Sequence, residues 1–338
     1  MRPGLLPIYS YALRAACRQP GRALAAWIAL LPVVQFAAHP ATAASPVVAQ
    51  PSPALEEIIV TASLREQPLA AVPASITVLG QETLQSAGLQ HLGDVLGLVP
   101  NLNWSGGTSR PRFFQLRGIG ELEQYQGAPN PSVGFLIDDI DLSGVGMPAT
   151  LFDAQQVEVL RGPQGTRYGA NALAGLVKIK TRDAATTPDF HAEVTGAEND
   201  TWSAGMAGGG PIGSAGSAWR MAGQMFSSDG FLRNAYLDRE DTNGRDESTL
   251  RGKLRWELAP GWRADLAALY VDIDNGFDAF TPDNSRTTLA DKPGRDAQRT
   301  RGVSADVAGR IGTYTVRSVS AYAWSDSVYS FDGDWGND

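Results

Sequence analysis

Alternation of apolar and charged residues at a period of two is the feature that most restricts the fold of residues 189–338. In its clearest segment an apolar or glycine row alternates with a charged row: Leu250, Gly252, Leu254, Trp256 and Leu258 against Arg251, Lys253, Arg255 and Glu257. The pattern recurs at 262–270, 302–309 and 314–325, and more weakly at 190–197, 201–209 and 217–227. A strand with this period has one apolar and one polar face. The sequence therefore predicts about seven antiparallel strands.

Two architectures place such faces differently. A soluble sandwich turns the apolar face inward, whereas an outer-membrane barrel turns it outward against lipid. The barrel is favoured by strands of about ten residues and by tight turns near 260 and 312 that alternate with long polar loops at 228–246 and 275–299. Trp256 and Trp262 flank one tight turn, where an interfacial aromatic girdle is expected.

Residues 1–44 are typical of a signal peptide. Arginines precede an apolar run, Ala23–Ala38, and the small residues of Ala41–Ala43 suit cleavage after Ala43 or Ala44. The alternative is a membrane anchor, which Pro32 and the short run disfavour. Cleavage removes Cys17, the single cysteine, so we expect a mature chain without disulfides.

Composition argues against several functions. Without the four arginines of residues 1–44, 24 Lys and Arg face 36 Asp and Glu, which makes a nucleic-acid partner a poor interpretation. Three histidines and no G-x-S-x-G motif disfavour a secreted hydrolase, so we expect no catalytic residues and no cofactor. The run at 139–144 imitates a calcium loop, but position twelve is Thr150 rather than the required Glu, so we expect no metal.

The segment 45–63 combines a Pro-rich linker with a run of β-branched residues, Ile58 to Thr61. One interpretation is an ordinary core strand. The other is a strand that its position between two Pro-containing stretches leaves exposed, and an exposed strand is a site for β-augmentation by a partner.

Residues 64–182 are predicted to form one small α/β domain. Strands are expected at 75–79, 111–118 and 133–138, and helices at 81–87 and 89–98. We expect Arg110, Arg112 and Arg117, which flank the strand at 111–118, to be solvated, with pairing to acids of a barrel wall as the alternative. A Gly/Pro-dense turn then joins two strands within 157–181. A phosphate-binding loop is a poor interpretation of that turn because the Lys-Ser/Thr pair is missing.

This last run closely resembles the plug signature of TonB-dependent outer-membrane receptors, V-E-V-x-R-G-P-x-G-x-x-Y-G-x-x-A-x-x-G-x-[VI]. The ending Val177–Arg182 departs mildly from the family pattern. The resemblance implies a TonB box at Glu57, Ile58, Ile59, Val60, Thr61 and Ala62. It implies plug-signature roles for Arg117, Gly118, Asp138, Arg161, Gly162, Pro163, Gly165, Tyr168, Gly169 and Gly175.

The resemblance implies an α+β plug followed by an antiparallel transmembrane β-barrel, with 189–338 as its incomplete N-terminal part, since such barrels have about 22 strands. It implies a receptor in the Gram-negative outer membrane that imports a scarce bulky solute, most simply a ferric siderophore. The expected partners are TonB, an iron chelate and outer-membrane lipid. Vitamin B12 or a carbohydrate is the alternative cargo. A signal-transducing receptor is the alternative class, for which the interval between leader and box is too short to hold a signalling domain.

Overall fold

The computed structural model describes residues 59–61, 67–87, 91–106, 108–122, 131–145, 150–168, 171–213 and 216–337. The predicted signal peptide and most of the linker lie outside these residues, as do Glu57, Ile58, Ala62 and Gly169.

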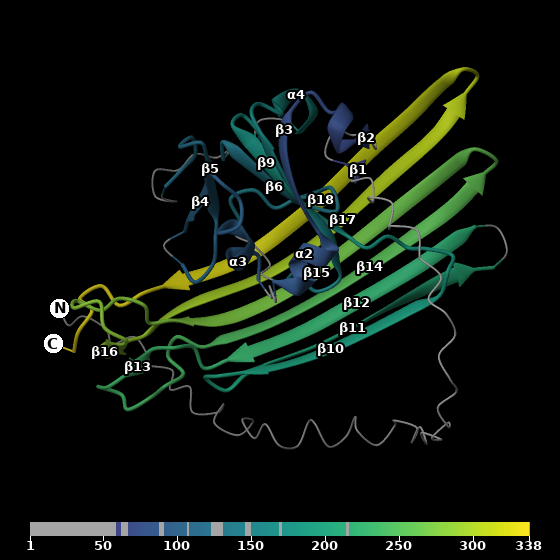
Figure 1. Cartoon of the computed structure of the whole chain (residues 1–338). Coiled ribbons are helices and arrows are strands. Elements are labelled where there is room, and N and C mark those ends of the chain that lie inside the picture. The colour runs from purple at the N-terminus through teal and green to yellow at the C-terminus, as the bar shows by residue number, and fades with distance from the viewer. Residues whose placement is uncertain are drawn as a thin grey trace, which may run out of the picture. The chain divides into compact units, whose positions relative to one another are not determined.

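A seven-stranded antiparallel sheet, here called the wall, dominates the described chain (Figure 1). Its strands follow one another in sequence order: β10 (Asp189–Ala197), β11 (Thr201–Ile212), β12 (Ser217–Ser228), β14 (Arg245–Ala259), β15 (Trp262–Phe277), β17 (Gly294–Ile311) and β18 (Tyr314–Ser330). Seven strands at the predicted places confirm the period-two interpretation. The two long loops carry a feature that the sequence did not reveal, a two-residue parallel pair between β13 (Arg233–Asn234) and β16 (Thr287–Thr288).

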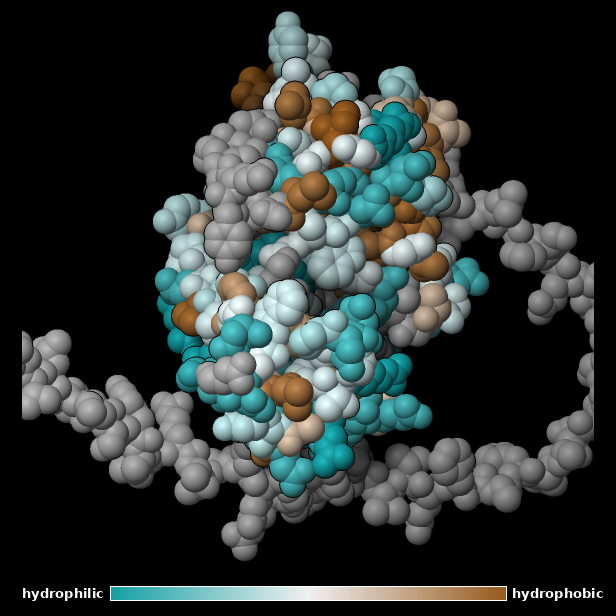
Figure 2. Space-filling model, turned by 90° about the vertical axis from the view of Figure 1, so that its left-hand side faces the viewer, coloured by the Kyte–Doolittle hydropathy of each residue, from teal (hydrophilic) through white to brown (hydrophobic). Residues whose placement is uncertain are grey.

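The two faces of the wall have opposite chemistry. Large apolar side chains are exposed on one face, including Leu250, Trp256 and Leu258. On the other face Glu247 and Arg251 are buried beneath the rest of the chain. This arrangement is that of a barrel, with its apolar face outward and its polar face inward, and a sandwich is excluded. Figure 2 views the end that carries β13 and β16, where hydrophilic residues predominate in the lower half.

The small domain, residues 67–182, has short elements. They are β2 (Gln67–Pro68), a 3-10 turn η2 (Leu69–Ala71), β3 (Ser75–Gly80), α2 (Gln81–Ser86), α3 (Leu92–Leu96), β4 (Leu102–Ser105), β5 (Phe113–Leu116), β6 (Val133–Ile137), β7 (Ile140–Asp141), β8 (Ala154–Arg161), α4 (Gly165–Tyr168) and β9 (Gly175–Thr181). A further strand, β1 (Ile59–Val60), precedes the domain.

A five-stranded sheet of order β3-β8-β9-β6-β7 forms the centre of the small domain. Only β6 and β9 run parallel among its described pairs, and β3 lies at an edge, bonded to β8 alone. Alternation along β8 divides the core: Val157 and Val159 pack with the helices, whereas Leu160 packs on the opposite face beside Val60. The larger core continues into the wall at Leu269, Val271 and Ile273.

Several elements are shorter than predicted. The expected strand at 111–118 spans only Phe113–Leu116, because Arg117 takes a left-handed φ of 54° and leads into a turn. The helix expected at 89–98 is confined to Leu92–Leu96, where Asp94 and the backbone N–H of His91 form half of a capping box. Strands β4 and β7 were not predicted, since two to four residues are too few for a period.

Candidate functional site: the stowed strand and its anchors

The strand β1 is folded back on the chain rather than extended from it. It pairs antiparallel with β2, with Ile59 opposite Pro68 and Val60 opposite Gln67. Val60 is fully buried against Leu136, Leu160 and other apolar side chains of the small domain. Burial of a valine side chain contributes about 1.5 kcal/mol. Of the two interpretations of this segment, an ordinary core strand and an exposed strand, the described residues 59–61 fit the first, because they are stowed against the small domain.

A buried carboxylate holds the end of this strand. Glu158 of β8 is completely buried and accepts hydrogen bonds from the Thr61 backbone N–H at 2.9 Å and from the Thr61 hydroxyl at 2.8 Å. Gln156 donates to Glu158 at 2.5 Å and to the Ile59 carbonyl at 3.0 Å. Hydrogen bonds to a charged acceptor are the stronger kind. The two β8 side chains thus occupy the edge of β1 that β2 leaves open.

The charge of Glu158 is balanced from the neighbouring strand. Lys178 of β9 lies directly opposite Glu158 in the β8–β9 register, and its Nζ is 2.6 Å from Asp139 Oδ1. Burial lowers the pKa of Lys178, but the negative charges of Asp139 and Glu158 outweigh burial and leave the pKa raised. Lys178 is therefore a permanent cation between the two carboxylates.

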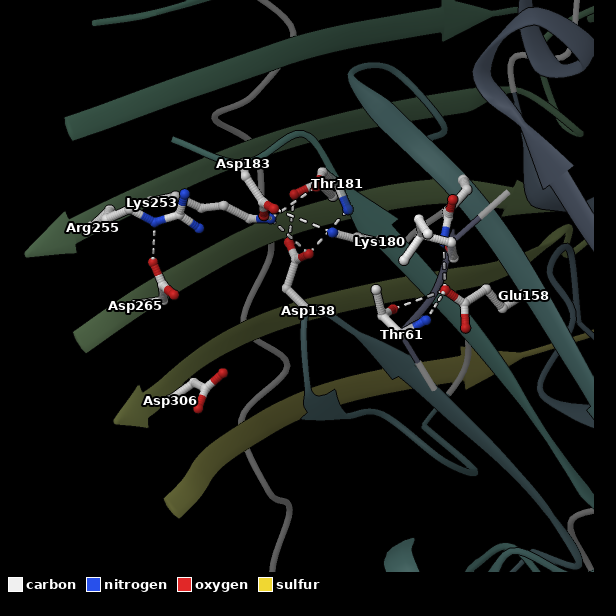
Figure 3. A network of polar contacts seen from close by, with 12 residues as sticks. Thr61, Asp138, Glu158, Lys180, Thr181, Asp183, Lys253, Arg255, Asp265 and Asp306 are labelled. Atoms are coloured by element: carbon white, nitrogen blue, oxygen red, sulfur yellow. Dashed lines mark hydrogen bonds and ion pairs between the residues drawn. The ribbon is translucent and has the colours of Figure 1, made fainter. Parts of the chain in front are cut away.

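Asp138 joins the same network to the wall (Figure 3). It accepts bonds from the Thr181 N–H at 3.0 Å and hydroxyl at 2.5 Å, and it pairs with Lys253 of β14 at 2.9 Å. Burial raises the pKa of Asp138, but the charge of Lys253 and the bonds from Thr181 hold it below its ordinary value. Ser304 of β17 adds a bond to the Asp138 carbonyl at 2.9 Å.

Asp183 also forms an ion pair with Lys253. Lys253 Nζ lies 3.3 Å from Asp183 Oδ1 and donates to the Thr181 carbonyl at 2.9 Å, while Lys180 lies 3.2 Å from the other Asp183 oxygen. Burial raises the pKa of Asp183, and the charges of Lys253 and Lys180 lower it by more, so the net shift is downward. Lys253 thus fastens the end of β9 to β14.

A second anchor lies further along the wall. Arg110 forms a bidentate pair with Asp296 of β17, with Nη2–Oδ1 at 2.7 Å and Nε–Oδ2 at 3.1 Å, and it donates to Gln298 at 2.8 Å. Arg110 and Asp296 are almost fully buried. The expectation of solvated arginines is therefore wrong for Arg110, and also for Arg112, which lies 3.7 Å from Asp296. Only Arg117 is exposed, with a bond of 3.1 Å to Ser75.

The remaining signature residues shape the small domain. Arg161 donates to the Thr77 hydroxyl at 2.8 Å and to the Pro100 carbonyl at 3.0 Å. Gly175 is buried where a Cβ would overlap the Leu160 carbonyl, so only glycine fits. Tyr168 packs on the face that holds Val60. The others lie in the turns around them: Gly118 and Gly162 with positive φ, Pro163 before α4, and Gly165 at its start.

The structure thus brings Ile59, Val60 and Thr61 together with β8 but leaves the signature residues spread over the domain. Sequence analysis did not identify Gln156, Lys178, Lys253 or Asp296 as contributors. A signal existed for Lys178, a charge inside an otherwise apolar strand. Within the described ranges, no group of three acidic, histidine or cysteine side chains is placed to hold a metal. None of the described helices is long and apolar enough to cross a membrane.

Comparison with known proteins gives a consistent result. Residues 68–176 match the family described as the TonB-dependent receptor plug domain. The vitamin B12 transporter BtuB of Vibrio vulnificus is 29% identical over 239 residues, which are 65% of this chain and 35% of that protein. The pesticin receptor of Yersinia pestis is 29% identical over 224 residues, 62% of this chain and 31% of the receptor. The chain thus spans about a third of the length of these curated relatives.

Solved structures agree on the fold. The crystal structure of the ferric yersiniabactin uptake receptor FyuA from Yersinia pestis superposes with a TM-score of 0.67 at 24% identity, over 78% of this chain and 43% of that one. The siderophore receptor PiuA from Acinetobacter baumannii gives a TM-score of 0.63 at 16% identity, over 78% and 38%. At such identities the likeness concerns the fold alone.

Proposed function

We propose that this chain is a TonB-dependent receptor of the Gram-negative outer membrane, with the small domain as plug and the wall as part of the barrel, and that it imports a scarce, bulky solute by a TonB-driven mechanism. A ferric siderophore is the cargo that we favour, because the solved relatives include receptors named for ferric siderophores. The BtuB similarity supports vitamin B12 as a second candidate. The relatives are named as a transporter and a receptor, which supports a transport function rather than an enzymatic one for this chain.

The position of β1 is the main observation that supports the proposal. Short connections at 213–216, 260–261 and 312–313 join the wall strands at one end. Both long loops lie at the other end, beside the short turn at 198–200, so we assign the first end to the periplasm. Thr61 lines a pocket of about 290 Å³ together with Arg263, Asp265 and Arg317, which lie near the tight turns. This position of β1 at the end that we assign to the periplasm supports its proposed role as the TonB box, since an inner-membrane partner can reach that side.

The stowed strand is closed to its partner. Strand addition needs a strand edge with free backbone groups. In this structure β2 pairs with one edge of β1, and Glu158 and Gln156 form hydrogen bonds with backbone groups of the other edge. We propose that solute binding at the extracellular side shifts the population toward a state in which β1 leaves β2 and Glu158. Release costs on the order of a few kcal/mol, from the burial of Val60 and the bonds to Glu158. TonB then pairs with the freed strand and draws on the inner-membrane proton gradient.

A pair of substitutions at Val60 tests the pairing in the receptor expressed from its complete gene. Val60→Pro removes a ladder donor and fixes φ, so solute uptake is expected to fail while binding at the cell surface persists. Val60→Ala is the matched control: it loses the same packing but keeps the backbone N–H, and uptake is expected to continue. Normal uptake by Val60→Pro would show that residues 58–62 are not the box.

The cargo is tested separately, by equilibrium binding of the purified receptor to ferric siderophores and to cyanocobalamin. Tight binding of an iron chelate alone is expected. Preference for the corrinoid would replace the siderophore proposal and leave the TonB proposal intact.

A further inference from the structure

The outer face of the wall carries an arginine where its apolar band ends. In the β15–β17–β18 register, Arg301 lies opposite Tyr270 on one side and Trp324 on the other. Its neighbours Thr300 and Gly302 point inward, since Thr300 is fully buried and a Cβ on Gly302 would meet Ile140 of the small domain. Alternation therefore places Arg301 on the lipid-facing side, where it is exposed.

From Arg301 toward the periplasmic turns, the outward positions of these three strands are without charge. They are Val303, Ala305, Val307, Gly309 and Ile311 on β17, with Trp262, Ala264, Leu266 and Ala268 on β15 and Tyr314, Val316, Ser318, Ser320 and Tyr322 on β18. The nine residues from Val303 to Ile311 in a strand tilted by about 40° span roughly 20–25 Å, about the height of the apolar band of an outer-membrane barrel. Arg301 is thus the first charge above the band, at the level of the outer-leaflet head groups.

The charges beyond this row differ from Arg301 in their pairing. Arg299 lies 3.0 Å from Asp272, and Arg295 lies 2.7 Å from Asp274, all on the outer face. Among the residues that the structure describes, no carboxylate lies within ion-pair distance of Arg301. The planar guanidinium group can donate two hydrogen bonds to one phosphate. Placing this charged group in the hydrocarbon region of a membrane is energetically unfavourable. Its anion is therefore expected to come from the membrane.

We propose that Arg301, flanked by Tyr270 and Trp324, binds a phosphate of a phosphorylated lipid in the outer leaflet. Exposed Val303 and Tyr322 lie one outward position below Arg301, where the acyl chains of such a lipid begin. The two aromatic side chains suit the interface itself. The site depends on the barrel assignment and is independent of the cargo and of TonB.

Binding of bis-phosphorylated lipid A to the complete receptor, purified in zwitterionic detergent, tests the site. Added lipid A is expected to raise the Tm of the wild-type receptor by a few degrees, and dephosphorylated lipid A and inorganic phosphate are expected to have no effect. Arg301→Gln is expected to weaken lipid A about tenfold, and Arg301→Lys to retain most of the affinity. Arg310→Gln is the matched control, since Arg310 is exposed at the periplasmic end of the same strand.

Three outcomes would overturn the proposal. Equal lipid A affinity of the wild type and Arg301→Gln would exclude this arginine. An equal shift with dephosphorylated lipid A would show that acyl chains alone bind. An equal shift with inorganic phosphate would indicate a site for free anions rather than for a lipid.

Discussion

At the residue scale, the buried carboxylate of Glu158 holds the stowed strand through two hydrogen bonds from Thr61. Alternation along V-E-V places Glu158 on the face opposite Val157 and Val159, and the structure confirms this placement. The sequence gives no sign that the opposite face is covered, because the residue that covers it, Thr61, is 97 positions away. Side-chain direction is a local property, whereas burial depends on contacts that local patterns do not encode.

Glu158→Gln is expected to loosen the stowed strand. The amide keeps one acceptor for Thr61 but removes the charge that Lys178 balances, so we expect a loss of about 1–2 kcal/mol from docking of β1. Binding of the purified TonB C-terminal domain to the solute-free receptor, measured by calorimetry, should tighten several-fold. The matched control is Glu82→Gln, a change at an exposed residue of α2. Unchanged TonB affinity in Glu158→Gln would mean that this carboxylate does not restrain the strand.

A glycine pair on the wall provides a second prediction at this scale. A Cβ on Gly309 would overlap the ring of Trp262, whereas a Cβ on Gly252 meets nothing within 4 Å. Gly309→Ala is therefore expected to displace Trp262 and destabilise the receptor by about 1–3 kcal/mol, seen as a lower Tm in detergent. Gly252→Ala should leave the Tm nearly unchanged. Equal Tm values for the two variants would contradict the packing described for Trp262.

At the element scale, the long wall strands could be predicted from the sequence, but the ion pairs that attach the small domain to them could not. For a strand such as β14, the position, the two faces and the following tight turn can all be predicted from its own residues. The partner of Lys253 is set by a turn at Asp138, where two consecutive aspartates take left-handed φ values of 47° and 68°. That geometry arises from the fold around the turn, and so the tie between β14 and β9 could not be read from the sequence.

Lys253→Met tests this tie, and its effect depends on pH. In the wild type, the lowered pKa values of Asp138 and Asp183 mean that both carboxylates stabilise the folded state above the unfolded pKa of about 4. This contribution is lost only as the pH falls through their lower folded values. Without the lysine, the buried carboxylate of Asp138 lacks its cation, which costs about 3 kcal/mol at neutral pH, whereas Asp183 is 40% exposed and keeps Lys180. The loss of stability in acid is then expected at higher pH than in the wild type.

Tm values of the detergent-solubilised receptor between pH 3 and pH 8 measure this change. Lys292→Met, a change at an exposed lysine of a long loop, serves as the control. Parallel Tm profiles for the wild type and Lys253→Met would rule out the tie as a source of stability.

At the scale of the whole molecule, the sequence predicted two bodies and seven wall strands but not how closely they share a core. Ile140 and Leu142 of the small domain lie in one buried cluster with Leu269, Val271 and Ile273 of the wall. Each of the two segments alone has only the pattern of an ordinary apolar run. The contact between them depends on the fold of the whole chain and cannot be predicted from either segment.

Fragments 45–185 and 45–338 are expected to behave differently. The shorter fragment keeps most of the cluster around Val157 and Val177 and should be soluble, with a mixed α/β circular dichroism spectrum. The longer fragment exposes the outer apolar face and the edges of β10 and β18, and should aggregate or need detergent. Solubility and thermal melting of both fragments measure this. A soluble, cooperatively melting monomer of 45–338 would be incompatible with the barrel.

The edge position of β3 has a mechanical consequence. Once β1 has left Glu158 and Gln156 of β8, a load applied at β1 passes along the chain to β3 before any other strand of the central sheet, and β3 is bonded to β8 alone. Detaching β3 leaves the β8-β9-β6-β7 ladder complete, and the anchors to the wall at Lys253 and Arg110 lie outside β3. A pulling force can therefore detach β3 from the edge of the central sheet while the rest of the small domain stays attached to the wall.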